Sequence, residues 1–200
     1  MENWIQNYFR ILCDLQLNVG ITNASQEVIG REEGYQSYIQ WVQTAHEQGG
    51  KVMFIGNGGS AGIASHVAID YSKNGHIRSM AFSDSSAITC LSNDCGYENV
   101  FAKQIEFHGN AKDVLVAISS SGRSKNILEA VAVAKKLSCK IVTFSGFDQN
   151  NSLRQLGDLN FYIASHSYGF VEVAHLGLIH SLLDYITEVL HQPKEAAGAI

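Results

Sequence analysis

The sequence is nearly free of proline and has no long apolar stretch. Pro193 is the one proline among 200 residues, so no proline-rich linker divides the chain, and we expect a single domain over residues 1–200. No apolar run approaches the roughly 20 residues that cross a membrane. The first ten residues, MENWIQNYFR, carry charge early and lack an apolar core, which argues against a signal peptide. We therefore expect no membrane partner.

Cysteine is also scarce, and its spacing excludes the usual cysteine-built sites. The four cysteines include no CxxC pair, so neither a disulfide framework nor a zinc knuckle is predicted. Isolated thiols are typical of proteins in the reducing cytoplasm, and this is the location we expect.

Charge is sparse and slightly negative. Charged residues make up 16% of the chain and the net charge is −5, so the broad basic surface that binds nucleic acid or anionic lipid is not expected. With 46% hydrophobic residues, the chain can bury a sizeable core. An anion site built locally from backbone amides and hydroxyls is compatible with this composition.

From residue 51 onward, apolar runs alternate with amphipathic stretches. This alternation predicts an α/β fold in which helices cover both faces of a parallel sheet. The expected strands are residues 52–55, 79–82, 114–118, 140–144 and 160–164. The expected helices are residues 60–73, 97–106, 124–137, 150–156 and 170–191. We assign residues 51–192 to this sheet-and-helix core.

Two further helices are predicted before the core, as an N-terminal helical hairpin over residues 1–50. Residues 4–17 and 33–48 have the apolar spacing of helices, and a glycine pair follows the second. Trp4, Tyr8 and Phe9 offer more apolar surface than a small isolated domain needs. These helices can pack on their own domain or on another subunit, and we expect some of both.

The segment 51–66, KVMFIGNGGSAGIASH, contains the first loop with a chemical role. A strand ends at Gly56, and Asn57, Gly58 and Gly59 lead into a helix that starts near Ser60. Glycines allow a ligand to approach the backbone closely, and a helix N-terminus favours an anion. A structural turn alone does not need Asn and Ser beside three glycines, so this loop is predicted to bind a ligand.

A second loop of the same kind is SSSGRS at residues 119–124. It follows a buried strand and precedes a helix, and Ser119, Ser120, Ser121 and Ser124 supply hydroxyl donors for phosphate oxygens. Ser124 also has the position of a helix cap, a role compatible with phosphate binding. Two such strand–loop–helix sites predict a phosphorylated ligand.

Together, GNGGSA at 56–61 and SSSGRS at 119–124 resemble the SIS (sugar isomerase) domain family, and the chain is most similar within it to the phosphoheptose isomerases. Further matches are Ser83-Asp84, Ser92-Asn93-Asp94, Gly96-Tyr97 and the pair His175 and His180. The resemblance covers nearly the whole chain. It implies a single SIS domain with a five-stranded parallel sheet flanked by helices, a homotetramer that uses the two N-terminal helices, and active sites at subunit interfaces.

The resemblance assigns substrate contacts to the two loops. It implies that Asn57 and Ser60, with Gly58 and Gly59 between them, and the four loop serines bind the sugar phosphate. It also places Asp94 near the substrate, although Asp94 could instead cap the helix expected at residues 97–106.

The resemblance further implies a zinc site and the catalytic pair. His66, Asp70, Glu172 and His180 stand at the positions of the metal ligands; Glu172 is also expected to contact substrate, and Asp70 and His180 are the expected acid and base. The four-residue spacing puts His66 and Asp70 on one helix face. Glu172 and His180 lie about two turns apart and can face one site, whereas His175 points about 140° away from His180 and is expected to pack.

Several positions depart from the family pattern. Asp70 and Glu172 replace Glu and Gln, so the ligand set carries two carboxylates, which suits Zn²⁺ and also accepts Mn²⁺ or Fe²⁺. Residues 74–78 form a shorter segment without the family's arginine, and residues 167–170 replace a stretch that contains Asp and Arg. These positions border the sugar, so they bear on which sugar is bound.

The implied activity is aldose–ketose isomerisation of a sugar phosphate, from sedoheptulose 7-phosphate to D-glycero-D-manno-heptose 7-phosphate, in heptose and surface polysaccharide synthesis. Such a reaction passes through an enediol and needs a base for a carbon-bound proton and an acid for the oxygen. Two alternatives stay open: an isomerase for another phosphosugar, and a non-catalytic SIS protein that binds phosphosugars or, like a replication regulator, a partner protein.

Overall fold

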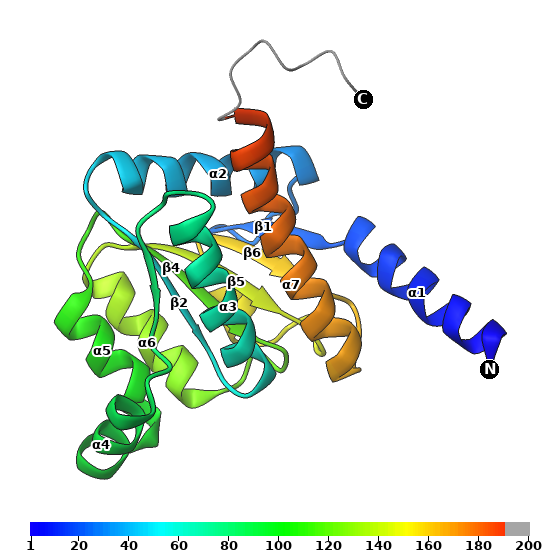
Figure 1. Ribbon diagram of the computed structural model, residues 1–200. Helices are drawn as coiled ribbons and strands as arrows, with labels where there is room; N and C mark the ends of the chain where they lie inside the picture. The colour runs from blue at the N-terminus through cyan, green and yellow to red at the C-terminus, as the bar shows by residue number, and fades with distance from the viewer. Residues whose placement is uncertain (191–200) are drawn as a thin grey trace.

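The structure, a computed structural model, describes residues 1–190 and contains a six-stranded sheet covered by helices (Figure 1). The strand order is β1-β6-β5-β4-β2-β3. The strands are β1 (Gly20–Asn23), β2 (Val52–Gly56), β3 (Ser79–Ala81), β4 (Val114–Ser119), β5 (Lys140–Ser145) and β6 (Leu159–Tyr162). The five strands expected from the sequence are all present, and they pair in parallel.

The sixth strand, β1, corrects the predicted count of five. It pairs antiparallel with β6, from Gly20 opposite Tyr162 to Asn23 opposite Leu159. β1 lies between the two N-terminal helices, so the expected helical hairpin of residues 1–50 is interrupted. Only Ile21 in its sequence GITN is a strongly apolar residue, and so short a strand has no periodicity to read.

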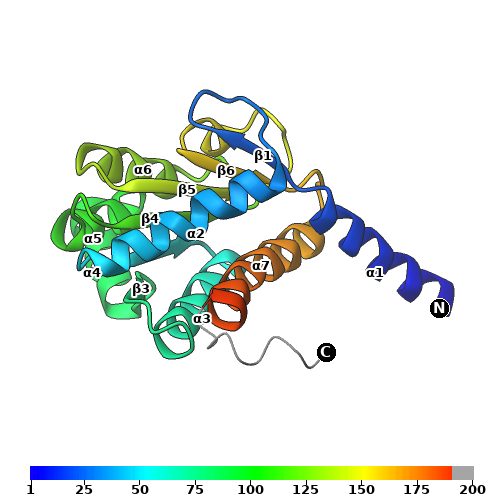
Figure 2. The ribbon, with the colours of Figure 1, turned by 90° about the horizontal axis from the view of Figure 1, so that it is seen from above.

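Among the described residues, helices cover both faces of the sheet (Figure 2). The first layer holds α2 (Arg31–Glu47), α3 (Gly59–Lys73) and α7 (Tyr168–Asp184), and the second holds α5 (Val100–His108) and α6 (Lys125–Lys136). α7 continues as a π-helical segment, η3 (Tyr185–Leu190). Residue 191 of the expected last helix, and the end of the expected core at 192, lie outside the described residues.

The segment between β3 and β4 differs from the prediction. A helix that the sequence did not reveal, α4 (Ser85–Cys95), precedes a short 3₁₀ helix, η1 (Tyr97–Asn99), and then α5. None of the residues of α4 is fully buried; Ile88 and Leu91 pack partly against the core on the α5 and α6 side of the sheet, and two apolar residues are too few to identify a helix from the sequence. The helix expected at 150–156 is reduced to the 3₁₀ helix η2 (Leu153–Gln155).

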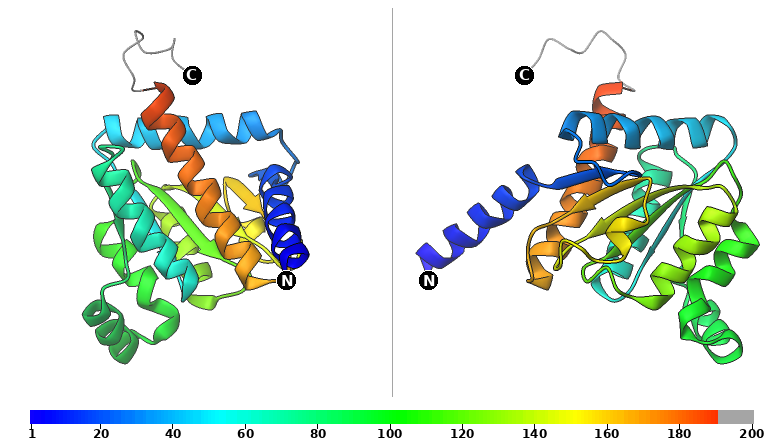
Figure 3. Two further views of the ribbon diagram at one scale, coloured as in Figure 1. Left: turned by 45° about the vertical axis from the view of Figure 1, so that its right-hand side comes forward. Right: turned by 180° about the vertical axis from the view of Figure 1, so that it is seen from behind.

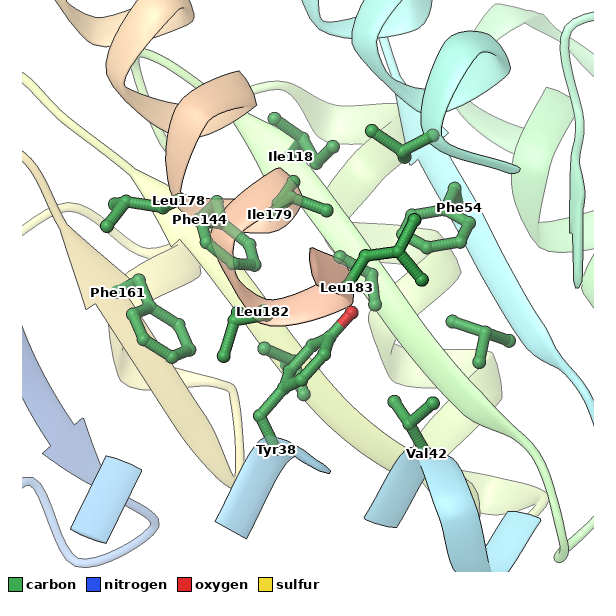
Figure 4. Packing of buried hydrophobic residues seen from close by; sticks show 14 of the residues in the cluster. Tyr38, Val42, Phe54, Ile118, Phe144, Phe161, Leu178, Ile179, Leu182 and Leu183 are labelled. Atoms are coloured by element: carbon green, nitrogen blue, oxygen red, sulfur yellow. The ribbon is translucent and has the colours of Figure 1, made fainter. Parts of the chain in front are cut away.

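The main core lies between the sheet and the layer of α2, α3 and α7. Figure 4 shows Leu178 and Ile179 of α7 over Phe144 and Phe161 of the sheet, with Tyr38 of α2 below. The Tyr38 and Tyr71 hydroxyls are 2.7 Å apart and tie α2 to α3. This packing fixes α7 beside α3, and the two helices are adjacent in both Figures 1 and 3.

The N-terminal helix α1 (Glu2–Leu17) projects from the body and packs on α7 (Figure 3). The ring of Tyr8 stacks on that of Phe170, with the ring centroids 4.5 Å apart. In contrast, Trp4 and Phe9 are 68% and 61% exposed. α1 therefore presents an uncovered apolar face at the surface of the protomer.

In the described part of the chain, no helix combines the length and the apolar character that crossing a bilayer requires.

The chain leaves the adjacent strands β2 and β4 toward opposite sides of the sheet. From β2 the chain passes through α3 to β3 on one side, and from β4 it passes through α6 to β5 on the other. Loops that leave neighbouring strands in opposite directions open a crevice at the carboxyl edge of an α/β sheet. The two loops predicted from the sequence meet at this edge.

Candidate active site

The first loop joins β2 to α3 through a backbone turn that requires glycine. Gly58 has φ 53° and ψ −122°, a conformation that side-chain-bearing residues avoid. No side chain caps α3, so the helix N-terminus offers its amides to an anion. Ser60, in the first turn, is only 3% exposed and lines the cavity described below.

The second loop turns at Gly122, where φ is 62°. A Cβ atom at this position would overlap the side chain of buried Asn151. The turn leaves the hydroxyls of Ser119 and Ser124 3.4 Å apart. Ser124 occupies the N-cap position of α6, but its side chain makes no capping hydrogen bond, so its hydroxyl is available to a ligand.

Together the loops line a cavity of 130 Å³. Its walls are Asn57, Ser60, Ser119, Ser120, Ser121, Ser124, Tyr168 and Glu172. All except Tyr168 were predicted from the sequence as substrate-binding residues. The Ser120 hydroxyl is buried without a hydrogen-bond partner among the described residues. A buried hydroxyl normally has a partner, and a phosphate oxygen in this cavity would provide one.

A hydrogen-bond network that the sequence did not reveal holds the two loops together. The side-chain amides of Asn57 and Asn126 exchange two hydrogen bonds of 2.9 Å. The Tyr97 hydroxyl donates to Asn57 Oδ1 at 3.0 Å. Asn126 is buried in the first turn of α6. Its partner is 69 residues away in the chain, and no local pattern signals such a pair.

His66, Asp70 and His180 form a compact cluster between α3 and α7. The Nε2 atoms of the two histidines are 3.1 Å apart, and Asp70 Oδ2 lies 3.3 Å from His66 Nε2 and 3.6 Å from His180 Nε2. Two ligand atoms held about 2.1 Å from a tetrahedral ion lie roughly 3.4 Å apart. Two imidazoles and one carboxylate at these separations fit a divalent metal with an open coordination position.

Glu172, the fourth expected metal ligand, is not part of this cluster. Its carboxylate lies over Gly59, where an added Cβ atom would overlap it. α3 and α7 run side by side, so Gly59 faces Glu172 and, two turns further on, His66 faces His180. Eight residues of helix span about 12 Å along the axis. The structure therefore groups three of the four predicted ligands and places Glu172 in the loop cavity.

His175 packs in the core, as expected. It is fully buried, its Nε2 donates to the Ser145 carbonyl at 3.1 Å, and its Nδ1 has no partner among the described residues. Burial lowers the pKa of His175 to about 4, against the opposing effect of the Ser145 hydrogen bond. This imidazole is neutral at neutral pH and takes no part in the site.

Asp94 lies away from the cavity of its own chain. It is in the last turn of α4, exposed, with its carboxylate 2.7 Å from Asn93 Nδ2. It caps no helix: Asp84 caps α4 by accepting from Ala87 N at 2.9 Å, and Asn99 precedes α5. Within one chain, therefore, Asp94 neither lines the cavity nor caps a helix, the two alternatives predicted from the sequence.

A larger cavity of 500 Å³ adjoins the second loop and shares Ser121 with the first cavity. Arg123 pairs there with Asp148 at 2.6 Å. The Asn150 backbone amide and the Arg123 guanidinium lower the pKa of the Asp148 carboxyl. Phe147, at φ 57°, stacks on His166 across this cavity. The Arg123 charge is thus already paired and lies outside the serine-lined cavity.

Comparison with known proteins agrees with this architecture. A family model described as SIS domain matches residues 23–146. The phosphoheptose isomerase of Helicobacter pylori strain P12 is 38% identical over 157 residues, which cover 76% of this chain and 81% of the relative. The phosphoheptose isomerase of Syntrophotalea carbinolica is 29% identical over 196 residues, which cover 95% of each chain.

Solved structures give the same result. A phosphoheptose isomerase from Francisella tularensis matches with a TM-score of 0.79 and 26% identity, over 94% of this chain and 98% of that one. The phosphoheptose isomerase GmhA from Neisseria gonorrhoeae matches with a TM-score of 0.76 and 27% identity, over 92% and 98%. The chain therefore belongs to the SIS domain family and, within it, to the phosphoheptose isomerases.

Proposed function

We propose that this protein is an aldose–ketose isomerase that converts sedoheptulose 7-phosphate to D-glycero-D-manno-heptose 7-phosphate for the synthesis of heptose-containing surface polysaccharide. One observation supports this most: a hydroxyl-lined cavity and a His–Asp–His cluster lie two turns apart along the same pair of helices. The cavity would hold the phosphate, and the sugar chain would run along α3 and α7 to bring its carbonyl end to the cluster.

We extend the proposal to a divalent metal, zinc by preference. His66, Asp70 and His180 would hold it, since their donor atoms have the separations of a three-ligand site. When bound, such an ion polarises the carbonyl and hydroxyl oxygens of a sugar. With carboxylate and imidazole donors only, the site would also accept Mn²⁺ or Fe²⁺.

Isomerisation moves a proton between adjacent carbons, and two side chains can serve that transfer. Asp70 is the base that takes the carbon-bound proton, and His180 is the acid that serves the oxygen. Both side chains are also proposed metal ligands, so the two roles compete: a donor atom that holds the ion cannot at the same time transfer the proton. Their side chains are only 17% and 30% exposed, which limits water at the reacting carbons. Asn57 and the loop serines hold the phosphate end fixed while the proton moves.

The assembly and location belong to the same proposal. We propose a homotetramer in which the exposed apolar face of α1 is covered and each site gains residues from a neighbour. Asp94, exposed on its own chain, is one side chain that a neighbouring site could use. The four cysteines are unpaired in the structure, as suits the cytoplasm.

The test is turnover of sedoheptulose 7-phosphate by the purified protein. We expect conversion by the wild type and a loss of kcat of a hundredfold or more in His180→Ala, because the acid is removed. His108→Asn changes an exposed histidine at the end of α5, on the opposite face of the sheet from α3 and α7, and should retain activity. Absence of turnover in the wild type, with phosphosugar binding intact, would instead favour the non-catalytic binding protein.

A further inference from the structure

Glu172 places a carboxylate in a cavity that otherwise suits a phosphate. The residue is partly buried at the start of α7, and its carboxylate closes over Gly59 at the N-terminus of α3. Among the described residues it accepts no hydrogen bond and joins no ion pair, although it lines the same cavity as the loop serines. This negative charge is a feature that phosphate binding alone does not explain.

Among the described residues, no other side chain that lines the cavity carries a charge to offset that of Glu172. The other lining side chains are one amide, five serine hydroxyls and one phenol, all uncharged. The nearest basic residue of the second loop, Arg123, is paired with Asp148 in the adjoining cavity. A phosphate dianion that enters alone therefore meets the repulsion of Glu172 with no cationic side chain in the lining to offset it.

A phosphorylated sugar carries a hydroxylated chain, which inorganic phosphate lacks. Its chain must leave the cavity along α3 and α7 to reach His180, and Glu172 stands at the beginning of that path. A carboxylate only accepts hydrogen bonds, and hydroxyls on the passing chain are donors that would satisfy it. The Glu172 carboxylate thus repels a free phosphate ion and accepts hydrogen bonds from the hydroxyls of a sugar chain.

We propose that Glu172 is a specificity-determining residue, which makes the site reject free phosphate and retain phosphates that carry a hydroxylated chain. The inference rests on the proposed function, because it requires the cavity to hold the phosphate of a sugar. It assigns to Glu172 a role in discrimination that does not depend on a metal.

The experiment measures equilibrium affinity by calorimetry for three ligands that cannot isomerise. Inorganic phosphate is the bare anion, n-heptyl phosphate adds an apolar chain, and a heptitol 7-phosphate adds hydroxyls but no carbonyl. In Glu172→Gln we expect affinity for the first two to rise about tenfold, since the repulsion is gone. Affinity for the heptitol phosphate should rise much less or fall, because a charge-assisted acceptor is lost with it.

The matched control is Glu188→Gln, which removes the same charge from an exposed residue further along the same segment. It should leave all three affinities unchanged. If Glu172→Gln alters all three by one common factor, or alters none, Glu172 does not discriminate and the inference is overturned. If the wild type does not bind the heptitol phosphate at all, it is the proposed function that fails.

A second measurement uses the wild type alone, in case Glu172→Gln does not fold. Thermal unfolding of the variant shows whether it has folded. The heptitol phosphate should bind at least tenfold more tightly than heptyl phosphate, because the apolar chain leaves the carboxylate without donors. Equal affinities for the two would also overturn the inference.

Discussion

Ser120 is the residue whose surroundings point most directly to a ligand. Its hydroxyl is buried, lines the serine-rich cavity and has no partner among the described residues. A hydrogen bond to a charged group contributes about 1.5–3 kcal/mol. Ser120→Ala should therefore weaken binding of a heptitol 7-phosphate about tenfold or more in a calorimetric titration, while the thermal midpoint stays the same or rises.

Thr22 provides the matched control for Ser120. Its hydroxyl is also buried without a partner among the described residues, but it lies in β1, away from the cavity. Thr22→Val should leave the affinity for the heptitol 7-phosphate unchanged. Equal losses of affinity in both variants would mean that the Ser120 effect is a general disturbance of the fold.

His175 makes a pH-dependent contribution to stability at the residue scale. Burial lowers its pKa from 6.5 to about 4, so the unfolded chain binds the proton more readily than the native one. The contribution is present above pH 6.5 and is lost as the pH falls toward 4, by about 3 kcal/mol in total.

This pH effect is measured as the free energy of unfolding of wild type and His175→Gln between pH 7.5 and 4. The Ser145 carbonyl and the Phe144 ring face the imidazole, and neither titrates. The wild type should lose stability across this range by more than the variant does. Parallel pH profiles would show that the buried imidazole is not the cause.

At the scale of the elements, the second loop depends on a left-handed turn at Gly122. Gly122→Ala combines an unfavourable φ with overlap on Asn151, and should cost about 2 kcal/mol of folding free energy. Phosphate binding should weaken with it, since the turn sets the serines. Denaturant unfolding and titration with the heptitol 7-phosphate measure the two effects.

Gly62 is the control for this loop prediction. It lies inside α3 with open space where a Cβ atom would be placed, so Gly62→Ala should be neutral or stabilise by up to about 1 kcal/mol. A Gly122→Ala protein as stable as Gly62→Ala would contradict the account of the turn.

Comparison of sequence and structure shows which elements can be predicted. The loops at 56–60 and 119–124 were predictable because strand, glycine turn and helix start are adjacent in the chain. β1 and α4 were not, because β1 has only four residues and α4 has only a short apolar pattern, which includes Ile88 and Leu91. The strand–turn–helix structure of the two loops was predicted correctly and β1 was missed, because a single sequence reveals only local patterns.

The site shows the same limit. His66 and Asp70 share a helix face by spacing, but the position of Glu172 depends on how α7 packs against α3. The Asn57–Asn126 pair likewise joins loops 69 residues apart. Such contacts follow from tertiary packing, which one sequence does not specify residue by residue.

For the whole molecule, α1 is the element that needs a partner. Trp4 and Phe9 are 68% and 61% exposed on a helix that projects from the body, and buried aromatic side chains dominate many interfaces. The double substitution Trp4→Glu and Phe9→Glu should reduce the proposed tetramer to smaller species in sedimentation velocity.

Val28 separates this effect from a general gain of charge. It is 81% exposed and apolar, but lies in the turn after β1. Val28→Glu should leave the sedimentation coefficient unchanged. A double α1 variant that sediments like the wild type would exclude α1 from the interface.

The most direct test of the central claim is a crystal structure with a heptitol 7-phosphate bound. The account predicts that the phosphate accepts hydrogen bonds from Ser120 and Ser124, and that the far end of the chain lies at His66, Asp70 and His180. A phosphate seated instead against Arg123 and His166 in the larger cavity, with the chain directed away from α3 and α7, would contradict it.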